Sequence, residues 1–331
     1  MSASLSPEEA IPYLHGCCGT YELDGRTGFS RFTEEELSYY GARSDTDFVR
    51  SHAPAGIRLE CITDAPEISF TYRLYREKGL YVIGSGFDIW ENDRFGAVFR
   101  IDPQNTDAVT VSYARRCSGP SRIRIRFTGG STVLFDGFCL GDAAPVENRS
   151  RTVLFYGDSI TQSAYIPAPS LSWTDLAAGW LDAEHLNRGI GSMIFEAPAL
   201  PSAPDCSPDL LFIEYGCNDI GKTPDNEKAL ASAEEWLGGI RRLYPDVPKY
   251  CILPGFIPRE GVSEEYRQRL APYCTALSGL CAAAGISVLP GRSLIPDISE
   301  LYYGDHVHFN EAGSALFAGN LVHALRQDGI S

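Results

Sequence analysis

Arg151-Thr-Val-Leu-Phe-Tyr-Gly-Asp-Ser-Ile-Thr161 is the stretch from which the fold of this chain is predicted. Its residues 152–156 form a short apolar run without the alternation of a solvent-facing strand, which indicates a buried central strand. Gly157 and Asp158 then break the run, and glycine permits a tight turn at that point. We expect residues 159–162 to begin a helix.

Ser159 therefore stands at the junction of a strand and a helix. Ligands of open α/β sheets bind at the carboxyl ends of the strands, and the free N–H groups of a helix N-terminus favour negative charge. This is a suitable place for a nucleophile whose transition state develops an oxyanion. The stretch is equally typical of an ordinary strand-to-helix connection capped by Asp or Ser, so it does not decide the function by itself.

Downstream of this stretch, apolar strand-like runs alternate with helical periodicity. Such alternation predicts a doubly wound parallel sheet, here a flavodoxin-like three-layer α/β/α domain over residues 150–331. The expected strands are 152–156, 185–190, 209–215, 249–254 and 286–289, and the expected helices are 172–182, 227–244, 263–284 and 310–327.

Upstream, residues 1–145 have the pattern of an all-β domain. In Arg122-Ile-Arg-Ile-Arg-Phe127 strict alternation directs the apolar side chains inward and the arginines outward. Short strands at this spacing predict a β-sandwich or jelly roll, joined by a polar linker at 142–150. The expected strands are 57–63, 67–75, 80–90, 94–101, 108–115, 122–128 and 132–140, with one short helix at 34–40.

Composition excludes several classes of partner. The chain has 331 residues and a formal net charge of −15, which argues against nucleic acid and against an anionic membrane surface. No window approaches the roughly 20 apolar residues of a membrane span. The N-terminus has neither a basic nor an apolar segment, and the ten cysteines lack zinc-type spacing. We therefore expect reduced thiols, no signal peptide and a cytoplasmic location.

Two further fragments follow strands of the predicted parallel sheet. Asn187-Arg-Gly-Ile-Gly-Ser192 is a glycine-rich turn whose backbone N–H groups are able to hold an oxyanion, although a plain turn explains the glycines as well. Glu214-Tyr-Gly-Cys-Asn-Asp219 contains Asn218, a neutral amide donor suited to the same task. A simple helix cap is the alternative interpretation of that asparagine.

Asp305-His-Val-His-Phe-Asn310 precedes the last predicted helix. Asp305 and His308 are close enough in sequence for the carboxylate to meet the imidazole and fix its tautomer, which leaves the other ring nitrogen to accept a serine proton. Metal binding by Asp305, His306 and His308 is a rival interpretation. No further His or Cys cluster completes such a shell, so no metal is predicted.

Together these fragments resemble, in order and spacing, the four signature blocks of the SGNH (GDSL-like) hydrolases. The resemblance implies that Ser159 is the nucleophile, that His308 is the general base and that Asp305 orients the histidine. It also implies an oxyanion hole that includes the Ser159 backbone N–H and the Asn218 amide. The matching blocks are Gly157–Thr161, Asn187–Gly191, Gly216–Asp219 and Asp305–His308.

One departure from the family pattern concerns the oxyanion hole. Counted from Asn187, the glycine of the family falls on Ser192, and Gly191 comes one residue earlier. A backbone N–H donates whatever the side chain, provided that a non-glycine residue adopts the required φ. The sequence leaves open which of the two residues donates.

The first half has a likeness of its own. Residues 51–58 and Gly84-Ser-Gly-Phe-Asp-Ile-Trp90 resemble the N-terminal β-domain of a subset of these esterases. Two-domain members of this kind are often carbohydrate esterases that remove acetyl groups from sugars. The resemblance thus implies a serine esterase that needs no cofactor and acts on a small-molecule or oligosaccharide ester.

The substrate is the least constrained expectation. Aromatic residues after the nucleophile, Tyr165 and Trp173, are candidates to stack on a sugar, and Arg259 in the loop after the fourth strand is a candidate for the pocket rim. Neither loop has the length or apolar character of a lipase lid, which favours short acyl groups. A thioesterase or lysophospholipase using the same site, a non-catalytic carbohydrate-binding protein and a homo-oligomer stay open.

Overall fold

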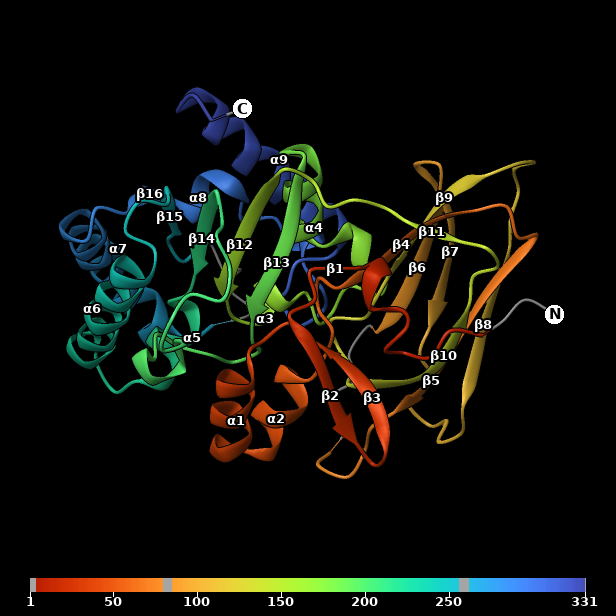
Figure 1. Cartoon of the computed structure of the whole chain (residues 1–331). Helices are drawn as coiled ribbons and strands as arrows, with labels where there is room; N and C mark the ends of the chain where they lie inside the picture. The colour runs from red at the N-terminus through yellow and green to blue at the C-terminus, as the bar shows by residue number, and fades with distance from the viewer. Residues whose placement is uncertain (1–3, 80–84, 256–261, 331) are drawn as a thin grey trace. The chain divides into compact units, whose positions relative to one another are not determined.

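The computed structural model describes residues 4–79, 85–255 and 262–330, and these form two compact units (Figure 1). The first unit comprises Met1–Arg149 together with Ala164–Ser170, and the second comprises Ser150–Ser163 and Leu171–Ser331. The predicted fold class, an all-β region followed by an α/β region, is confirmed. Nothing in the sequence indicated that residues 164–170 would pack with the first unit.

The first unit is a sandwich of two antiparallel sheets, as predicted. Alternate side chains of both sheets meet in one core, in which Ile123 and Ile125 are buried between the outward-facing arginines of the same strand. One sheet has the order β1 (Leu14–His15), β4 (Arg58–Thr63), β9 (Ser121–Arg126), β6 (Gly86–Glu91) and β7 (Arg94–Arg100), with β11 (Ala144–Pro145) paired to β4. The other has the order β2 (Gly19–Leu23), β3 (Arg26–Ser30), β10 (Val133–Cys139), β5 (Glu67–Leu74) and β8 (Val109–Ala114).

The first 51 residues contain elements that apolar periodicity did not reveal. The hairpin of β2 and β3 turns at Asp24 and Gly25, which both have positive φ, and the exposed polar side chains of β2 hide its strand character. Helix α1 (Glu34–Arg43) extends past the predicted end, and Ser44 caps the unpredicted α2 (Asp45–Ser51). The first part of the predicted strand 80–90 lies outside the described residues.

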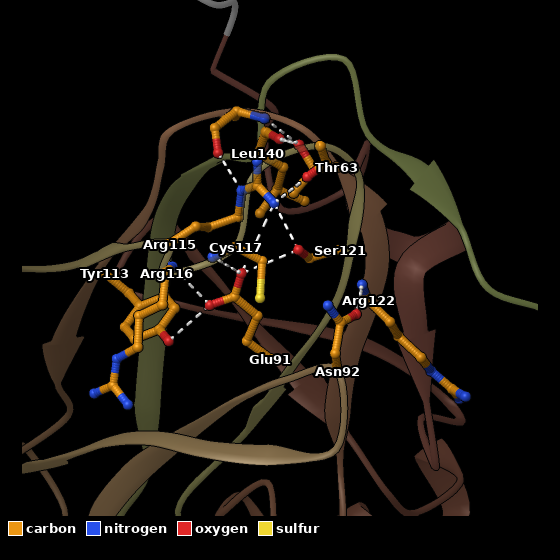
Figure 2. Close-up of polar contacts among 12 residues, drawn as sticks. Thr63, Glu91, Asn92, Tyr113, Arg115, Arg116, Cys117, Ser121, Arg122 and Leu140 are labelled. Carbon is orange, nitrogen blue, oxygen red and sulfur yellow. Dashed lines mark hydrogen bonds and ion pairs between the residues drawn. The ribbon is translucent and has the colours of Figure 1, made fainter.

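Glu91, at the end of β6, holds the connection between β8 and β9 (Figure 2). Its buried carboxylate accepts hydrogen bonds from the backbone N–H groups of Arg116 (2.8 Å) and Cys117 (3.1 Å). It also accepts from Ser121 Oγ at 3.0 Å and from Tyr113 Oη at 3.1 Å. Burial alone raises the pKa of Glu91, but these donors outweigh it and lower the pKa to about 2.

The segment 164–170 is part of the first unit through its contacts with β6. The backbone N–H of Ser170 donates to Oδ2 of the buried Asp88 at 2.7 Å. A side chain on Gly86 would overlap the carbonyl oxygen of Pro167, so the glycine is what allows the segment to approach the strand this closely.

The second unit is built on a parallel sheet in the order β13-β12-β14-β15-β16, which is the 2-1-3-4-5 order of flavodoxin-like folds. Val153 and Phe155 face α4 and α9 on one side, while Tyr156 packs against Trp236 of α6 on the other. The strands are β12 (Arg151–Gly157), β13 (Ala183–Gly189), β14 (Leu210–Glu214), β15 (Lys249–Ile252) and β16 (Ser287–Leu289). The helices are α3 (Ser159–Gln162), α4 (Trp173–Trp180), α5 (Cys217–Lys222), α6 (Asn226–Leu243), α7 (Glu264–Ala283), α8 (Gly291–Leu294) and α9 (Glu311–Gln327).

The register of the parallel strands brings the carboxyl ends of three of them together. Gly157 of β12 is paired with Gly189 of β13 and with Glu214 of β14. The segments that follow these strands therefore leave the sheet from neighbouring positions, and they carry Ser159, Ser192 and Asn218.

Candidate active site

Gly157 makes the sharp turn that presents Ser159. A side chain on Gly157 would overlap Thr161 Oγ1 and press on the carbonyl of Glu214, so only glycine lets β12 turn directly into α3. Asp158 then caps the helix, because its Oδ1 accepts the backbone N–H of Ile160 at 2.9 Å. Ser159 occupies the first helical position.

Ser159, His308 and Asp305 form a continuous hydrogen-bonded chain, although the serine and the histidine lie 149 positions apart in sequence. Ser159 Oγ lies 2.7 Å from His308 Nε2, and His308 Nδ1 lies 2.6 Å from Asp305 Oδ2. A carboxylate only accepts hydrogen bonds, so the ring proton belongs on Nδ1 and Nε2 is left to accept the serine proton.

The carboxylate of Asp305 is itself held in place. Its Oδ1 accepts the backbone N–H groups of Val307 (2.9 Å) and His308 (3.0 Å). Burial raises the pKa of Asp305, but the His308 ring and these N–H groups outweigh that effect and lower the pKa to about 2. The carboxylate is therefore charged near neutral pH, as the hydrogen bond to the ring requires.

Candidate oxyanion donors border the same site. Ser192 lines the pocket with φ of 67°, the left-handed backbone that a glycine would adopt without strain. The N–H of Gly191 donates to Gln162 Oε1 at 2.6 Å. Asn218 also lines the pocket, and one of its two amide N–H bonds donates to Asp158 Oδ2 at 2.8 Å.

The pocket around these residues has a volume of about 460 Å³ and lies within the second unit. Polar and charged side chains outnumber apolar ones in its walls, and its volume lies in the range of small-molecule sites. Its lining includes Ser159, His308, Ser192, Asn218, Ile160, Ile220, Val307, Tyr266 and Arg269.

Two lining residues on α7, Tyr266 and Arg269, were not expected. The guanidinium of Arg269 donates to Asn226 Oδ1 (3.0 Å) and to the carbonyl oxygen of Thr223 (2.8 Å). These are neutral acceptors, so the charge of the arginine faces the pocket without a bonded carboxylate among the described residues. No local motif marks either position, because their approach to the site depends on where α7 crosses the sheet.

The three substrate candidates have different locations. Trp173 is 1% exposed and packs between Phe155 and Phe317 in the core, with Nε1 donating to a backbone carbonyl. It belongs to the core rather than to the pocket lining. Tyr165 lies on the segment 164–170 of the first unit, and Arg259 lies outside the described residues.

Three buried acids surround the nucleophile turn: Asp158, Glu214 and Asp219. Burial raises the pKa of each, and the neighbouring charge of Asp158 adds to the effect at Glu214, whose pKa lies well above its usual value. Burial raises the pKa of Asp219 to about 7. These pKa shifts arise from packing, so no sequence pattern predicts them.

Within residues 4–79, 85–255 and 262–330, no three His, Cys, Asp or Glu side chains are grouped so as to hold a metal ion. In the same ranges, every helix is too short or too polar to span a membrane.

A protein-family model covers most of the second unit. Residues 155–316 match the model of the GDSL-like Lipase/Acylhydrolase family. None of the curated proteins compared with the chain matches it.

Solved structures resemble the whole chain in fold. The salicylyl-acyltransferase SsfX3 from a tetracycline biosynthetic pathway has a TM-score of 0.77 at 17% identity, over 99% of this chain and 98% of that one. A family two carbohydrate esterase from Cellvibrio japonicus has a TM-score of 0.66 at 15% identity, over 99% and 97%. The family two carbohydrate esterase from Clostridium thermocellum, in complex with cellohexaose, has a TM-score of 0.63 at 17% identity, over 83% and 93%.

Proposed function

We propose that this chain, a carboxylic ester hydrolase with a domain of the GDSL-like lipase/acylhydrolase family, removes short acyl groups, acetyl above all, from a carbohydrate. The proposal includes the mechanism: an acyl-enzyme on Ser159, formed with His308 as base and Asp305 as its orienting partner. The observation that carries it is the 2.7 Å contact between Ser159 Oγ and His308 Nε2, with Asp305 directly behind the ring.

The reaction follows from these positions. Ser159 Oγ attacks the ester carbonyl carbon while its proton moves to His308 Nε2, and the imidazolium then protonates the departing alcohol. Water attacks the resulting acyl-serine, giving one proton to the same nitrogen, and the carboxylic acid leaves as the proton returns to Ser159. Asp305 keeps its charge throughout and stabilises the imidazolium.

Two donors besides the Ser159 backbone N–H would stabilise the tetrahedral oxyanion. The N–H of Gly191 is engaged by Gln162, so we assign the second backbone donor to Ser192, which lines the pocket. The third is the N–H of the Asn218 amide that does not bond Asp158. Three donors converging from three strand ends form the kind of preorganised hole that acyl transfer needs.

The substrate class is supported by the pocket and by the relatives. A volume of about 460 Å³ suits a short acyl group and one sugar better than a long acyl chain. Two of the structural relatives are family two carbohydrate esterases, one of them in complex with cellohexaose. The polar members of the lining are consistent with a hydroxyl-rich alcohol.

Transfer of the acyl group to an alcohol other than water is the second candidate. It uses the same acyl-enzyme, and the fold is shared over nearly the full length with a salicylyl-acyltransferase. The two outcomes differ only in what attacks the acyl-serine, so the product identifies which one occurs.

The test is hydrolysis of p-nitrophenyl esters of increasing chain length and of acetylated xylo- and cello-oligosaccharides, with and without an acceptor alcohol. We expect the highest kcat/KM for acetyl esters, free acetate as the product, and no turnover by Ser159→Ala. Equal rates for the wild type and Ser159→Ala would refute the nucleophile. A maximum beyond butyryl esters would favour a lysophospholipase, and a preference for acyl thioesters would favour a thioesterase. Glycan binding without any esterase activity would favour a non-catalytic binding protein.

A further inference from the structure

Two buried carboxyl groups lie in contact directly beneath the nucleophile turn. Asp158 is 1% exposed and Glu214 is 6% exposed, and their side chains are hydrogen-bonded to each other. Because an ionised carboxylate has no hydrogen to donate, a hydrogen bond between two carboxyl groups requires that one of them carry a proton.

The other contacts indicate which of the two is charged. Asp158 Oδ1 accepts the backbone N–H of Ile160 at 2.9 Å, and Oδ2 accepts Asn218 Nδ2 at 2.8 Å. Glu214 Oε2 accepts Thr161 Oγ1 at 2.9 Å. Glu214 also accepts the backbone N–H of Asp158. Both oxygens of Asp158 thus accept N–H donors, whereas Glu214 accepts one backbone N–H and one hydroxyl, so we assign the proton to Glu214.

The electrostatics agree with this assignment. Burial raises the pKa of both groups, and at Glu214 the charge of Asp158 raises it further, to well above the usual value. At Asp158 the backbone donor and the charge of His308 act in the opposite direction. The pair in turn raises the pKa of four neighbouring titratable groups, Asp219, Cys217, Cys251 and Tyr266.

We propose that Glu214 is a positioning residue for the oxyanion hole: its protonated carboxyl fixes the Asp158 carboxylate, and Asp158 in turn fixes the Asn218 amide. The proposal rests on the function proposed above, because it assigns Asn218 as an oxyanion donor. Glu214 does not touch the substrate. It acts at the end of β14, from beneath the turn that presents Ser159.

The physical reason is charge repulsion at a dry site. If both carboxyl groups were ionised, like charges in hydrogen-bond contact would repel with little solvent to screen them. If Glu214 were absent, Asp158 would lose one of the groups that hold it beneath the nucleophile. In either case Asn218 would lose a fixed acceptor, and the amide would no longer be preorganised for the oxyanion.

The experiment compares Glu214→Gln and Glu214→Ala in p-nitrophenyl acetate hydrolysis near neutral pH, each alone and with Asn218→Ala. The glutamine amide donates where the shared proton stood and still accepts from Thr161, so we expect kcat within about threefold of the wild type. The alanine variant should lose about 10- to 100-fold in kcat with a smaller change in KM. On the Asn218→Ala background, the same alanine substitution should cost no more than about threefold.

Several results would overturn the proposal. A glutamine variant as impaired as the alanine variant would mean that an ionised Glu214 is needed. Full activity of Glu214→Ala would mean that Glu214 does not act through the Asn218 amide. The same conclusion would follow if the fold loss in kcat of the double variant equalled the product of the losses of the two single variants. If circular dichroism shows that Glu214→Ala does not fold, Thr161→Val replaces it in the same comparison. Thr161→Val should lower kcat less than Glu214→Ala, and its effect should again be smaller on the Asn218→Ala background.

The outcomes also separate this inference from the proposed function. Hydrolysis that depends on Ser159 but ignores Glu214 would refute the positioning role alone. Hydrolysis that survives Ser159→Ala would refute the mechanism itself.

Discussion

The two units of this protein treat their buried acids in opposite ways. In the β-sandwich, burial tends to raise the pKa of Glu60 and Glu91, but arginines around the first and hydrogen-bond donors around the second lower each pKa to about 2. In the α/β unit, burial prevails, and the pKa values of Asp158, Glu214 and Asp219 are all raised.

The difference lies in how completely each carboxyl is compensated. Glu91 accepts four hydrogen bonds, whereas Oδ2 of the buried Asp219 has no hydrogen-bond partner. A compensated buried charge stabilises a fold, while an undercompensated one is tolerated where it serves a site. Burial of an acid alone therefore does not mark function. The three buried acids with raised pKa values lie beside the nucleophile turn, while Asp305, which bonds His308, has a lowered pKa like Glu91.

The largest expected effect comes from removing the proposed nucleophile or the proposed base of the α/β unit. We expect Ser159→Ala and His308→Ala each to lower kcat by about 10⁴-fold or more, because the proposed mechanism has no other nucleophile to replace Ser159 and no other base to replace His308. Initial rates of p-nitrophenyl acetate hydrolysis measure this, with circular dichroism to confirm folding. Residual activity near the wild-type rate would place the chemistry elsewhere.

A second test compares one asparagine from each unit. Asn218→Ala should lower kcat by about 10²–10³-fold through loss of an oxyanion donor. Asn105→Ala in the β-sandwich, which removes only the acceptor for the N–H of Asp107, should change kcat less than about twofold. Equal effects on kcat would contradict the assignment of the hole.

Glu91→Gln tests the compensated acid. We expect about 1–3 kcal/mol of lost stability at pH 7, because the amide replaces a charged acceptor by a weaker one, with kcat unchanged. The pKa of Glu91 is lowered in the folded state, so its contribution is present above about pH 4.5 and disappears as the pH falls towards 2. Thermal unfolding of both proteins between pH 7 and pH 3 should therefore converge; a constant difference would be evidence against the charge.

Asp219→Asn tests the undercompensated acid and should show the opposite pH trend. Because its pKa is raised in the folded state to about 7, ionisation costs stability as the pH rises from about 4 to about 7. The asparagine keeps the acceptor for the Phe195 N–H and removes the charge. The free energy of unfolding of Asp219→Asn should exceed that of the wild type by up to about 1–2 kcal/mol over that range. If the variant instead became less stable than the wild type as the pH rises, the charge would be stabilising.

The smallest expected effect concerns the backbone at Ser192, which we propose as an oxyanion donor. Ser192→Gly relieves a positive φ and should leave kcat within about twofold while raising stability by about 0.5–1 kcal/mol or less. A large fall in kcat would show that the hydroxyl, rather than the backbone N–H, is the group that matters.

Much of the fold and the central site could be predicted because both depend on local patterns. The buried run before Gly157 and the Asp305/His308 spacing are short-range signals, and doubly wound topology brings strand ends together whatever lies between. The short α5 escaped prediction because its N-cap, Gly216, has a left-handed conformation and because the helix is too short to show apolar periodicity.

What could not be predicted depends on three-dimensional packing. Nothing near Gln162 shows that its side chain takes the N–H of Gly191, and nothing near Arg269 shows that α7 carries it to the pocket. Trp173 was a candidate to stack on a sugar, but it is part of the core. An aromatic residue near a site and one in the core have the same sequence pattern, so the sequence does not distinguish them.

The segment 164–170 has a consequence for modularity. The chain enters the second unit at Ser150, returns to the first at Ala164 and re-enters at Leu171, so no single splice separates the halves. A fragment starting at Ser150 would carry Ala164, Ile166 and Ala168, all buried in the intact protein, without β6, which this segment contacts through Pro167 and Ser170. Exchanging one unit between related enzymes would also require the segment 164–170 to match the first unit. We therefore expect the two units to be inherited together.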